Sequence, residues 1–416
     1  GDTTSSVIRD LLGYPVRAVM LAATGQHVGK TTLSLGVFRG LIKRWGVGRV
    51  AYCKPLGQRY FEVDLEDGRR VKVDADVEVI RRTFKLTHPW ECMSPVLFPP
   101  GYTRECIDGK VHSHVLLEKI KDAFTVLATS ADFTLLEGSG HMGVGSIANL
   151  NNAQVAGALG LEVVIVAPGG LGVSFDTLAL NKALLEKHGA RLRGVILNKV
   201  SPDKYDMVKD YYGRQLHKLW KTPLLGCIPY KDVISRPSLN GFCQLLNGVF
   251  ISAEEDRMRT FETTRLIMSD GDVDRTIYAA IKEQLVVTHV SRTDVIDATI
   301  KNHMATLENS KGTESLRGGL ILVGTAGPPP HLLQGLRAAK IPTVFIQTSG
   351  IGSSSVSSFE VMKAMTAFTQ KHDYDDADRL SRTMDLIEAN IDFDTLCQAP
   401  PFGGQMAIKM GKLVPW

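Results

Sequence analysis

The sequence predicts an α/β protein in which a mostly parallel sheet, covered by helices on both faces, is followed by a smaller α/β domain. The first observation is a series of short, continuous apolar runs, and the second is the presence of helical patterns between them. The runs are residues 16–23, 50–53, 133–136, 163–167, 194–197 and 224–228. A strand buried on both faces reads as such a run, so each is expected to be a strand of one parallel sheet.

The helical patterns place apolar residues three to five positions apart. One joins Leu33, Val37 and Leu41 and ends at Gly46, and another extends over residues 116–127. This spacing directs one apolar stripe of each helix toward the sheet. Strands that alternate with helices of this length predict right-handed crossovers and a parallel sheet.

The chain is expected to form two domains, at roughly 150 residues per domain or more. Alternating residues around Gly68 predict a hairpin inserted at residues 59–73. Pro237, Asn240 and Gly241 then break the pattern, and a second series of runs follows at 285–290, 320–323 and 342–346, with helical patterns at 356–368 and 380–391. The predicted parts are a first domain at 1–240, a second at 245–395 and an extended tail at 396–416.

Composition restricts the classes of function. Apolar residues make up 44% of the 416 residues and charged residues 22%, as in a soluble globular protein. A formal net charge of +4 is too small to indicate nucleic-acid binding, and no run reaches the roughly 18 apolar residues of a membrane span. The six cysteines form no C-x-x-C pair, which favours a reducing compartment. We expect an intracellular protein of the cytoplasm or an organelle matrix, the mitochondrion included if a transit peptide was removed.

A P-loop is the strongest functional motif, because it follows the first predicted strand and opens the first predicted helix. Its residues are Gly25, Gln26, His27, Val28, Gly29, Lys30, Thr31 and Thr32. Backbone N–H groups of such a loop surround a phosphate at the positive end of the helix. Lys30 then neutralises the terminal phosphates and Thr31 binds Mg²⁺. Thr24 stands where the motif usually begins with glycine.

Polar residues at the ends of other predicted strands are expected to face the same crevice, since open parallel sheets bind ligands at that edge. Glu137 ends one strand and enters a glycine-rich loop, and Lys54 leaves the end of another. Asp74 and Asp76 are further candidate metal ligands, with a helix N-cap as the alternative for one of them. Asn198 ends another strand and could read a purine. Ser201 stands where a guanine-specific N-K-x-D motif needs aspartate, so adenine is favoured.

In chain order, these motifs resemble those of dethiobiotin synthetase and its relatives over residues 16–238. The motifs are Gly29-Lys30-Thr31-Thr32, Lys54-Pro55, Asp74-Ala75-Asp76, Glu137-Gly138-Ser139-Gly140, Pro168-Gly169-Gly170-Leu171-Gly172 and Leu197-Asn198-Lys199-Val200. The similarity is closer still to the dethiobiotin-synthetase-like domain that opens long bacterial phosphate acetyltransferases. In those relatives a DRTGG domain follows, and residues 245–395 resemble a degenerate copy of it.

The resemblance implies ATP and Mg²⁺ as cofactors and assigns a role to each matching position. Lys30, Thr31 and Thr32 would hold the ATP phosphates, and Asn198 would contact adenine. The implied Mg²⁺ ligands are Thr31, an aspartate of the Asp74/Asp76 pair, and Glu137. Lys30 and Lys54 are the candidate catalytic residues, because phosphoryl transfer needs clustered cations. Leu56-Gly57-Gln58 and His141 depart from the synthetase pattern, so its diamine substrate is not carried over.

The leading interpretation is a Mg-ATP-binding protein that transfers a phosphoryl group to an unidentified small-molecule acceptor. The alternative is a nucleotide-dependent or nucleotide-free structural or regulatory module of a larger assembly, with a protein partner or a homodimer. A complete phosphate acetyltransferase is not expected, because only residues 396–416 follow the DRTGG-like region. A cobyrinate-type amidase is not expected either, since Cys243 lacks the glycine that follows such a nucleophile.

Overall fold

The structure, a computed structural model, describes residues 4, 16–65, 67–268, 281–348, 357–368, 370, 374 and 376–398. The chain divides into two compact units. Unit 1 comprises Gly1–Tyr230 together with His372–Trp416, and unit 2 comprises Lys231–Lys371. Unit 2 is therefore an insertion in the chain of unit 1.

The sheet of unit 1 has the strand order β10-β9-β8-β1-β7-β2, and these strands pair in parallel. The strands are β1 (Ala18–Ala23), β2 (Val50–Cys53), β7 (Phe133–His141), β8 (Glu162–Pro168), β9 (Arg191–Val200) and β10 (Leu224–Pro229). Each corresponds to one of the predicted runs, which confirms the predicted fold class. The strand order reverses at β1, and open parallel sheets bind ligands at the carboxyl end of such a point.

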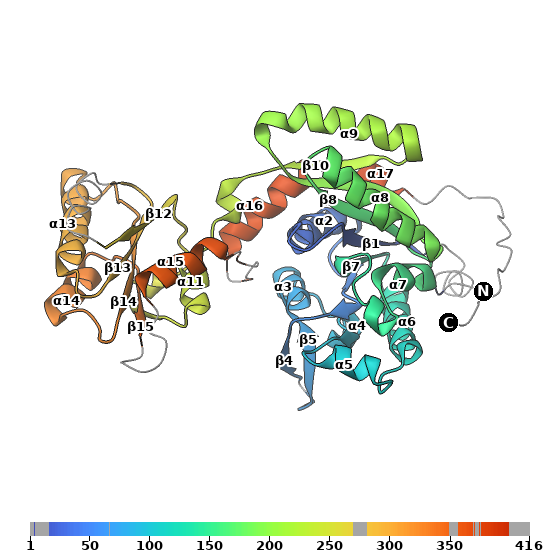
Figure 1. Ribbon diagram of the computed structural model, residues 1–416, viewed down its shortest axis with the longest axis horizontal. Helices are drawn as coiled ribbons and strands as arrows, with labels where there is room; N and C mark the ends of the chain where they lie inside the picture. Colours follow the sequence, from blue (N-terminus) through green and yellow to red (C-terminus); the bar gives the residue numbers. More distant parts are fainter. Residues whose placement is uncertain are drawn as a thin grey trace. The chain divides into compact units, whose positions relative to one another are not determined.

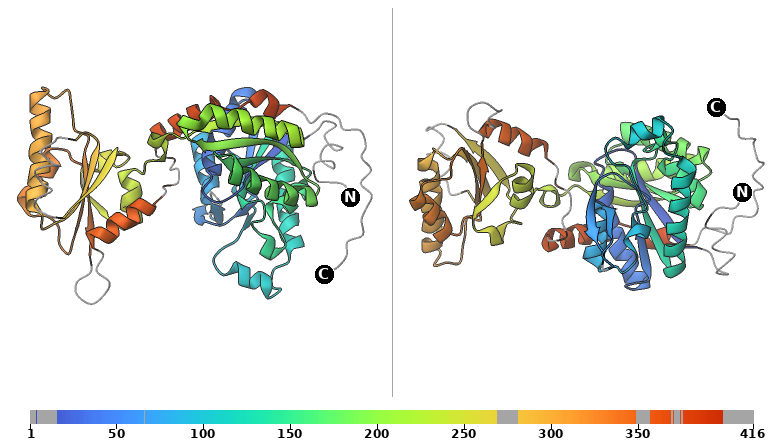
Figure 2. Two further views of the ribbon diagram at one scale, coloured as in Figure 1. Left: turned by 45° about the horizontal axis from the view of Figure 1, so that its top comes forward. Right: turned by 90° about the horizontal axis from the view of Figure 1, so that it is seen from below.

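Helices cover both faces of this sheet (Figures 1 and 2). One face packs against α6 (Ser113–Ser130), α7 (Asn152–Leu159), α8 (Gly172–Lys187) and α9 (Tyr205–Trp220). The other face packs against α2 (Lys30–Trp45), α3 (Ala75–Phe84), α16 (Ala377–Glu388) and α17 (Phe393–Cys397). Leu33, Val37 and Leu41 of α2 are fully buried, as their spacing predicts. Among the helices of the described ranges, none is both long and apolar enough to cross a membrane.

The predicted hairpin lies between β2 and α3. Its strands β4 (Tyr60–Asp64) and β5 (Arg70–Asp74) pair antiparallel, which confirms the prediction at residues 59–73. Because β5 ends at Asp74 and α3 begins at the next residue, the hairpin leads directly into the candidate aspartates. The short elements of unit 1 are β3 (Leu56–Gly57), α4 (Trp90–Met93), β6 (Val96–Leu97), α5 (Tyr102–Ile107), η1 (Ser146–Ala148) and η2 (Pro202–Lys204).

Unit 2 is a smaller α/β domain with the strand order β11-β15-β14-β13-β12. The strands β12 (Thr263–Ile267), β13 (Gln284–His289), β14 (Gly319–Gly324) and β15 (Thr343–Gln347) are parallel, whereas β11 (Val249–Ser252) is antiparallel to β15. Helices α13 (Thr293–Asn309) and α14 (Pro330–Ala338) cover one face, and α11 (Leu239–Leu245) and α15 (Ser358–Ala367) cover the other (Figure 2). The shorter α10 (Asp232–Ser235) and η3 (Glu254–Asp256) complete it.

The domain boundaries differ from the predicted ones at the carboxyl-terminal side. The sequence analysis placed residues 245–395 in the second domain and an extended tail at 396–416, but α16 and α17 pack in unit 1. Arg39 of α2 pairs with Asp385 at 2.5 Å and with Glu388 of α16. An amphipathic pattern shows that a helix has an apolar face, but it does not show which hydrophobic core that face packs against. The sequence therefore could not assign α16 and α17 to one of the two domains. Residues 399–416 lie outside the described residues.

Candidate functional site

The loop between β1 and α2 carries the P-loop motif, and its backbone requires a glycine directly before the helix. Gly29 has a φ of 94°, in the left-handed region. A Cβ atom at Gly29 would also lie 2.5 Å from Asn198 Nδ2, so a larger residue would be both strained and in collision. Lys30 and Thr31 then form the start of α2, where the N–H groups of the first turn have no partner within the helix.

Two residues near the end of β9 hold the P-loop. Asn198 Nδ2 donates a hydrogen bond to Val28 O at 2.7 Å, and Lys199 Nζ donates one to His27 O at 3.1 Å. Asn198 Oδ1 accepts from the backbone N of Lys199 at 2.9 Å. The structure thus brings Asn198 to the P-loop. However, both the oxygen and the nitrogen of its side-chain amide already form hydrogen bonds with backbone atoms of the chain. A contact with adenine would require Nδ2 to exchange Val28 O for the base.

Glu137 links α2 to the neighbouring strands from a fully buried position. Thr31 Oγ1 donates a hydrogen bond to Glu137 Oε1 at 3.0 Å, and the Tyr52 hydroxyl donates one to Oε2 at 2.8 Å. Burial and the charge of Asp76 raise the pKa of Glu137, while the ammonium of Lys54 opposes them. Burial and Glu137 raise the pKa of Tyr52 well above its usual value, so its hydroxyl remains a donor.

Lys54 lies buried between the two candidate aspartates, with only 6% of its surface exposed. Its Nζ donates to Asp74 Oδ1 at 2.8 Å and to Asp76 Oδ2. Burial alone would lower the pKa of Lys54, but the charges of Asp76 and Asp74 outweigh it and raise the pKa above the ordinary value. Asp74 is the N-cap of α3, since its side chain accepts from Asp76 N at 2.9 Å, and its Oδ2 accepts from Gln58 N at 3.1 Å. The N-cap alternative is therefore confirmed for Asp74.

The side chains at this edge of the sheet fit the Mg²⁺ that the resemblance implies. Mg²⁺ takes oxygen ligands, commonly one or two carboxylates completed by phosphate oxygens and water. Thr31, Asp76 and Glu137 offer one hydroxyl and two carboxylates. Asp74 fits less well, because its oxygens accept three hydrogen bonds from the chain, two of them from backbone N–H groups, and it serves as the N-cap of α3. Within the described residues no group of three His, Cys, Asp or Glu side chains is arranged to hold a metal by itself, so phosphate oxygens would have to complete the site.

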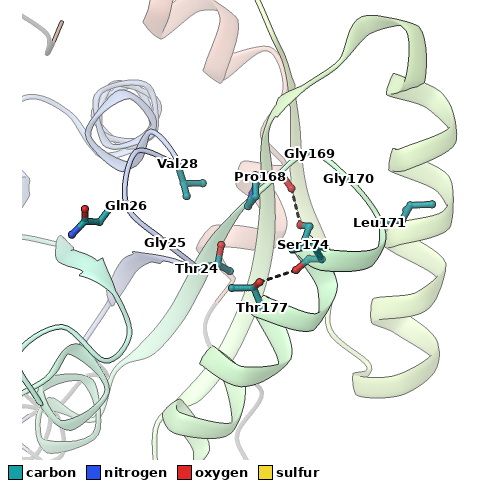
Figure 3. Close-up of a pocket in the computed structure, with 11 residues that line it drawn as sticks. Thr24, Gly25, Gln26, Val28, Pro168, Gly169, Gly170, Leu171, Ser174 and Thr177 are labelled. Atoms are coloured by element: carbon teal, nitrogen blue, oxygen red, sulfur yellow. Dashed lines mark hydrogen bonds between the residues drawn. The ribbon is translucent and has the colours of Figure 1, made fainter. Parts of the chain in front are cut away.

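A cavity of about 390 Å³ lies on the other side of the P-loop, next to β8. The P-loop and the loop after β8 face each other across it (Figure 3). Its lining consists of Thr24, Gly25, Gln26, Val28, Pro168, Gly169, Gly170, Leu171, Val173, Ser174 and Thr177. Ser174 Oγ donates to Pro168 O at 2.7 Å, which ties the start of α8 to the end of β8. The P-loop thus has this cavity on the β8 side and the buried charged cluster on the β7 side.

The sequence model of the AAA_26 family, described as an AAA domain, matches residues 17–238, which is more than half of the chain. The chain belongs to this family. The AAA_26 domain contains the P-loop, the parallel sheet of unit 1 and the charged cluster, so a P-loop fold of the type that binds nucleotides is established for this part of the chain.

Curated relatives confirm the predicted resemblance. The phosphate acetyltransferase of Pseudomonas aeruginosa is 26% identical over 398 residues, which cover 91% of this chain and 51% of that protein. The ATP-dependent dethiobiotin synthetase of Gloeothece citriformis is 30% identical over 51% of this chain and 88% of that protein. A cobyric acid synthase of Clostridium perfringens is 30% identical over 52% of this chain and 47% of that protein. The chain spans about half the length of the phosphate acetyltransferase and of the cobyric acid synthase.

Three residues that shape the site of the AAA_26 domain were not singled out from the sequence. Tyr52 holds Glu137, as described above. Asn152 Nδ2 donates to the carbonyl oxygens of Ser139 and His141, each at 2.7 Å, and so holds the loop after β7. Asn181 Oδ1 accepts from Met142 N at 3.0 Å. A polar residue inside a predicted strand or helix is the available signal, but sequence position does not reveal its partner.

Proposed function

We propose that this AAA_26 domain binds ATP together with Mg²⁺ and transfers the terminal phosphoryl group to a small-molecule acceptor. One arrangement supports the proposal above all others. The first turn of the P-loop helix, which carries the half-buried Lys30, meets the buried side chains of Lys54, Asp76 and Glu137 at the carboxyl edge of the sheet. Phosphoryl transfer depends mainly on positioning and on the stabilisation of negative charge, which such a cluster can supply.

Each side chain has a distinct role in this proposal. Lys30 and the first-turn N–H groups of α2 bind the terminal phosphates. Thr31, Glu137 and Asp76 would hold Mg²⁺, which when bound would offset the charge of the phosphate oxygens. Lys54 contacts Asp76, so its ammonium would lie close to a metal held by Asp76 and could stabilise charge on the transferring group. ATP is preferred to GTP because Ser201 replaces the aspartate that would read guanine.

The test is a calorimetric titration of Mg-ATP and Mg-GTP into the wild-type chain and into Lys30→Ala. A matched control is Lys121→Ala, which removes a half-buried lysine that pairs with the exposed Glu118 on α6. Micromolar binding of ATP that Lys30→Ala loses and Lys121→Ala retains is the expected result. A screen for acceptors that raise ATP hydrolysis then follows. Absence of binding to the wild-type chain contradicts the proposal.

A regulatory or structural module is a second candidate, and one observation favours it. The charged cluster is satisfied by the chain itself, since Lys54 is neutralised by two aspartates and Asn198 is bonded to the P-loop. If the chain is such a module, it should bind nucleotide, but no acceptor should stimulate hydrolysis. The full chain should also capture a protein partner. Stimulation by an acceptor that requires Lys30 and Lys54 excludes this candidate.

A further inference from the structure

Tyr52 lies on β2, the edge strand of the sheet of unit 1, and is fixed there in three ways. Its backbone lies on β2, where it pairs with Leu135 of β7, two residues before Glu137. Its ring meets Phe38 of α2 edge-on, with 6.0 Å between the ring centroids. Its hydroxyl donates to Glu137 Oε2 at 2.8 Å, and the Tyr52 side chain is fully buried. The strand, the helix and the hydrogen bond together leave the phenol one position.

The two oxygens of the Glu137 carboxylate accept hydrogen bonds from different hydroxyl groups. Oε1 accepts from Thr31 at 3.0 Å and faces the P-loop helix, whereas Oε2 accepts from Tyr52 and faces the core. A buried carboxylate is stable only when donors compensate its lost hydration. When Oε1 binds a metal, Thr31 must turn its hydroxyl hydrogen away. The bond from Tyr52 can then persist, since it acts on the other oxygen.

We propose that Tyr52 is a positioning residue, which holds Glu137 so that Oε1 is presented to the metal of a bound metal–nucleotide complex. The inference rests on the proposed function, because it concerns the same site. A residue that forms a hydrogen bond with the atom of a ligand side chain that does not contact the metal sets the orientation of that side chain. It thereby contributes to metal affinity. Tyr52 does so from the β2 side of the sheet, across from the P-loop.

The experiment uses the full chain with Tyr52→Phe, which removes one oxygen and keeps the ring packed against Phe38. ATP affinity is measured by calorimetry with Mg²⁺ and with EDTA, and the ratio of the two dissociation constants gives the metal-dependent gain. We expect this gain to fall by about 10- to 100-fold in Tyr52→Phe, while metal-free ATP binding is unchanged. Tyr205→Phe is the matched control, because it also removes a hydroxyl that donates a 2.8 Å hydrogen bond, there to Cys227 O. Its gain should equal that of the wild type.

A second variant separates positioning from a general loss of structure. Glu137→Gln should itself lose the metal-dependent gain, and adding Tyr52→Phe to it should change the gain less than twofold, since the two residues act as one unit. An unchanged gain in Tyr52→Phe, or equal losses with and without metal, overturns the positioning role and leaves the proposed function standing. Additive losses in the double variant overturn it as well. A wild-type chain that binds no ATP overturns both proposals.

Discussion

Replacement of Lys54 by methionine tests whether the charged cluster is a true buried ion pair. Methionine keeps the length of the side chain and removes its charge. Removal of one partner from a buried pair costs about 3–5 kcal/mol, because it strands the other charge. Asp74 keeps hydrogen bonds from Asp76 N and Gln58 N, so only part of the charge that loses Lys54 is left uncompensated. We therefore expect the lower end, about 3 kcal/mol of lost unfolding free energy.

The assay is urea unfolding of the full chain followed by tryptophan fluorescence, which reports unit 1 because the described tryptophans, Trp45, Trp90 and Trp220, all belong to it. Lys121→Met is the control, since its exposed pair with Glu118 should contribute less than about 0.5 kcal/mol. Asp76→Asn in the Lys54→Met background removes one of the two charges that lose Lys54 and should recover more than half of the loss. A cost no larger than that of Lys121→Met, or no recovery by Asp76→Asn, would refute the reasoning.

The pH dependence of this loss follows from the direction of the pKa shift. The raised pKa of Lys54 means that its stabilisation is complete below the ordinary value of 10.5 and is lost only as the pH rises through the higher pKa of the folded state. The difference between the wild type and Lys54→Met should therefore stay constant through neutral pH and shrink only in strong alkali.

Three further predictions concern packing, protonation and the P-loop. Gly36→Ala places a Cβ against Ile387 and should lower the free energy of unfolding by about 1–3 kcal/mol. Gly213→Ala, where the nearest atom to the new Cβ would be 3.8 Å away, should stabilise α9 by up to about 1 kcal/mol. Equal effects of the two variants in urea unfolding would contradict this. Burial lowers the pKa of His303 to about 4, so the stability of unit 2 should fall by up to about 3 kcal/mol as the pH drops from 6.5 toward 4, and hydrogen exchange in His303→Gln should lack this dependence. Asn198→Ala frees the P-loop and should weaken ATP and GTP binding alike by about fivefold in calorimetry, while a loss confined to ATP would identify an adenine contact instead.

The fold of unit 1 could be predicted because its signals are local. Buried parallel strands are continuous apolar runs, and β2 begins and ends at the predicted residues 50–53. The antiparallel β11 at the edge of unit 2 was missed, since it has only four residues, of which Ser252 alone is buried and is polar, so they give no long apolar run. α16 was predicted as a helix but placed in the wrong domain. The apolar pattern of a helix does not show which other helix it packs against, here α2, which is far away in the sequence.

The candidate site was predictable to the extent that strand ends meet at one edge of the sheet. That rule brought Thr31 and Glu137 together at 3.0 Å, although they are 106 residues apart. The rule does not distinguish Asp74 from Asp76, because both follow the same strand. The difference arises from the turn into α3, which commits Asp74 to backbone N–H groups and leaves Asp76 beside Lys54. Hydrogen-bond partners of this kind depend on atomic positions that residue order does not specify.

The segment after unit 2 has a consequence for the P-loop itself. α2 begins with the last residues of the P-loop motif, and its buried glycines Gly36 and Gly40 allow Ile387 and Phe393 to approach its backbone. Arg39 adds ion pairs to α16 from the same helix. The helix that presents Lys30 is thus packed between the sheet and residues that are encoded after all of unit 2. A chain that ends at residue 238, where the AAA_26 match ends, would leave that face of α2 uncovered, so the P-loop unit needs the returning segment to complete its core.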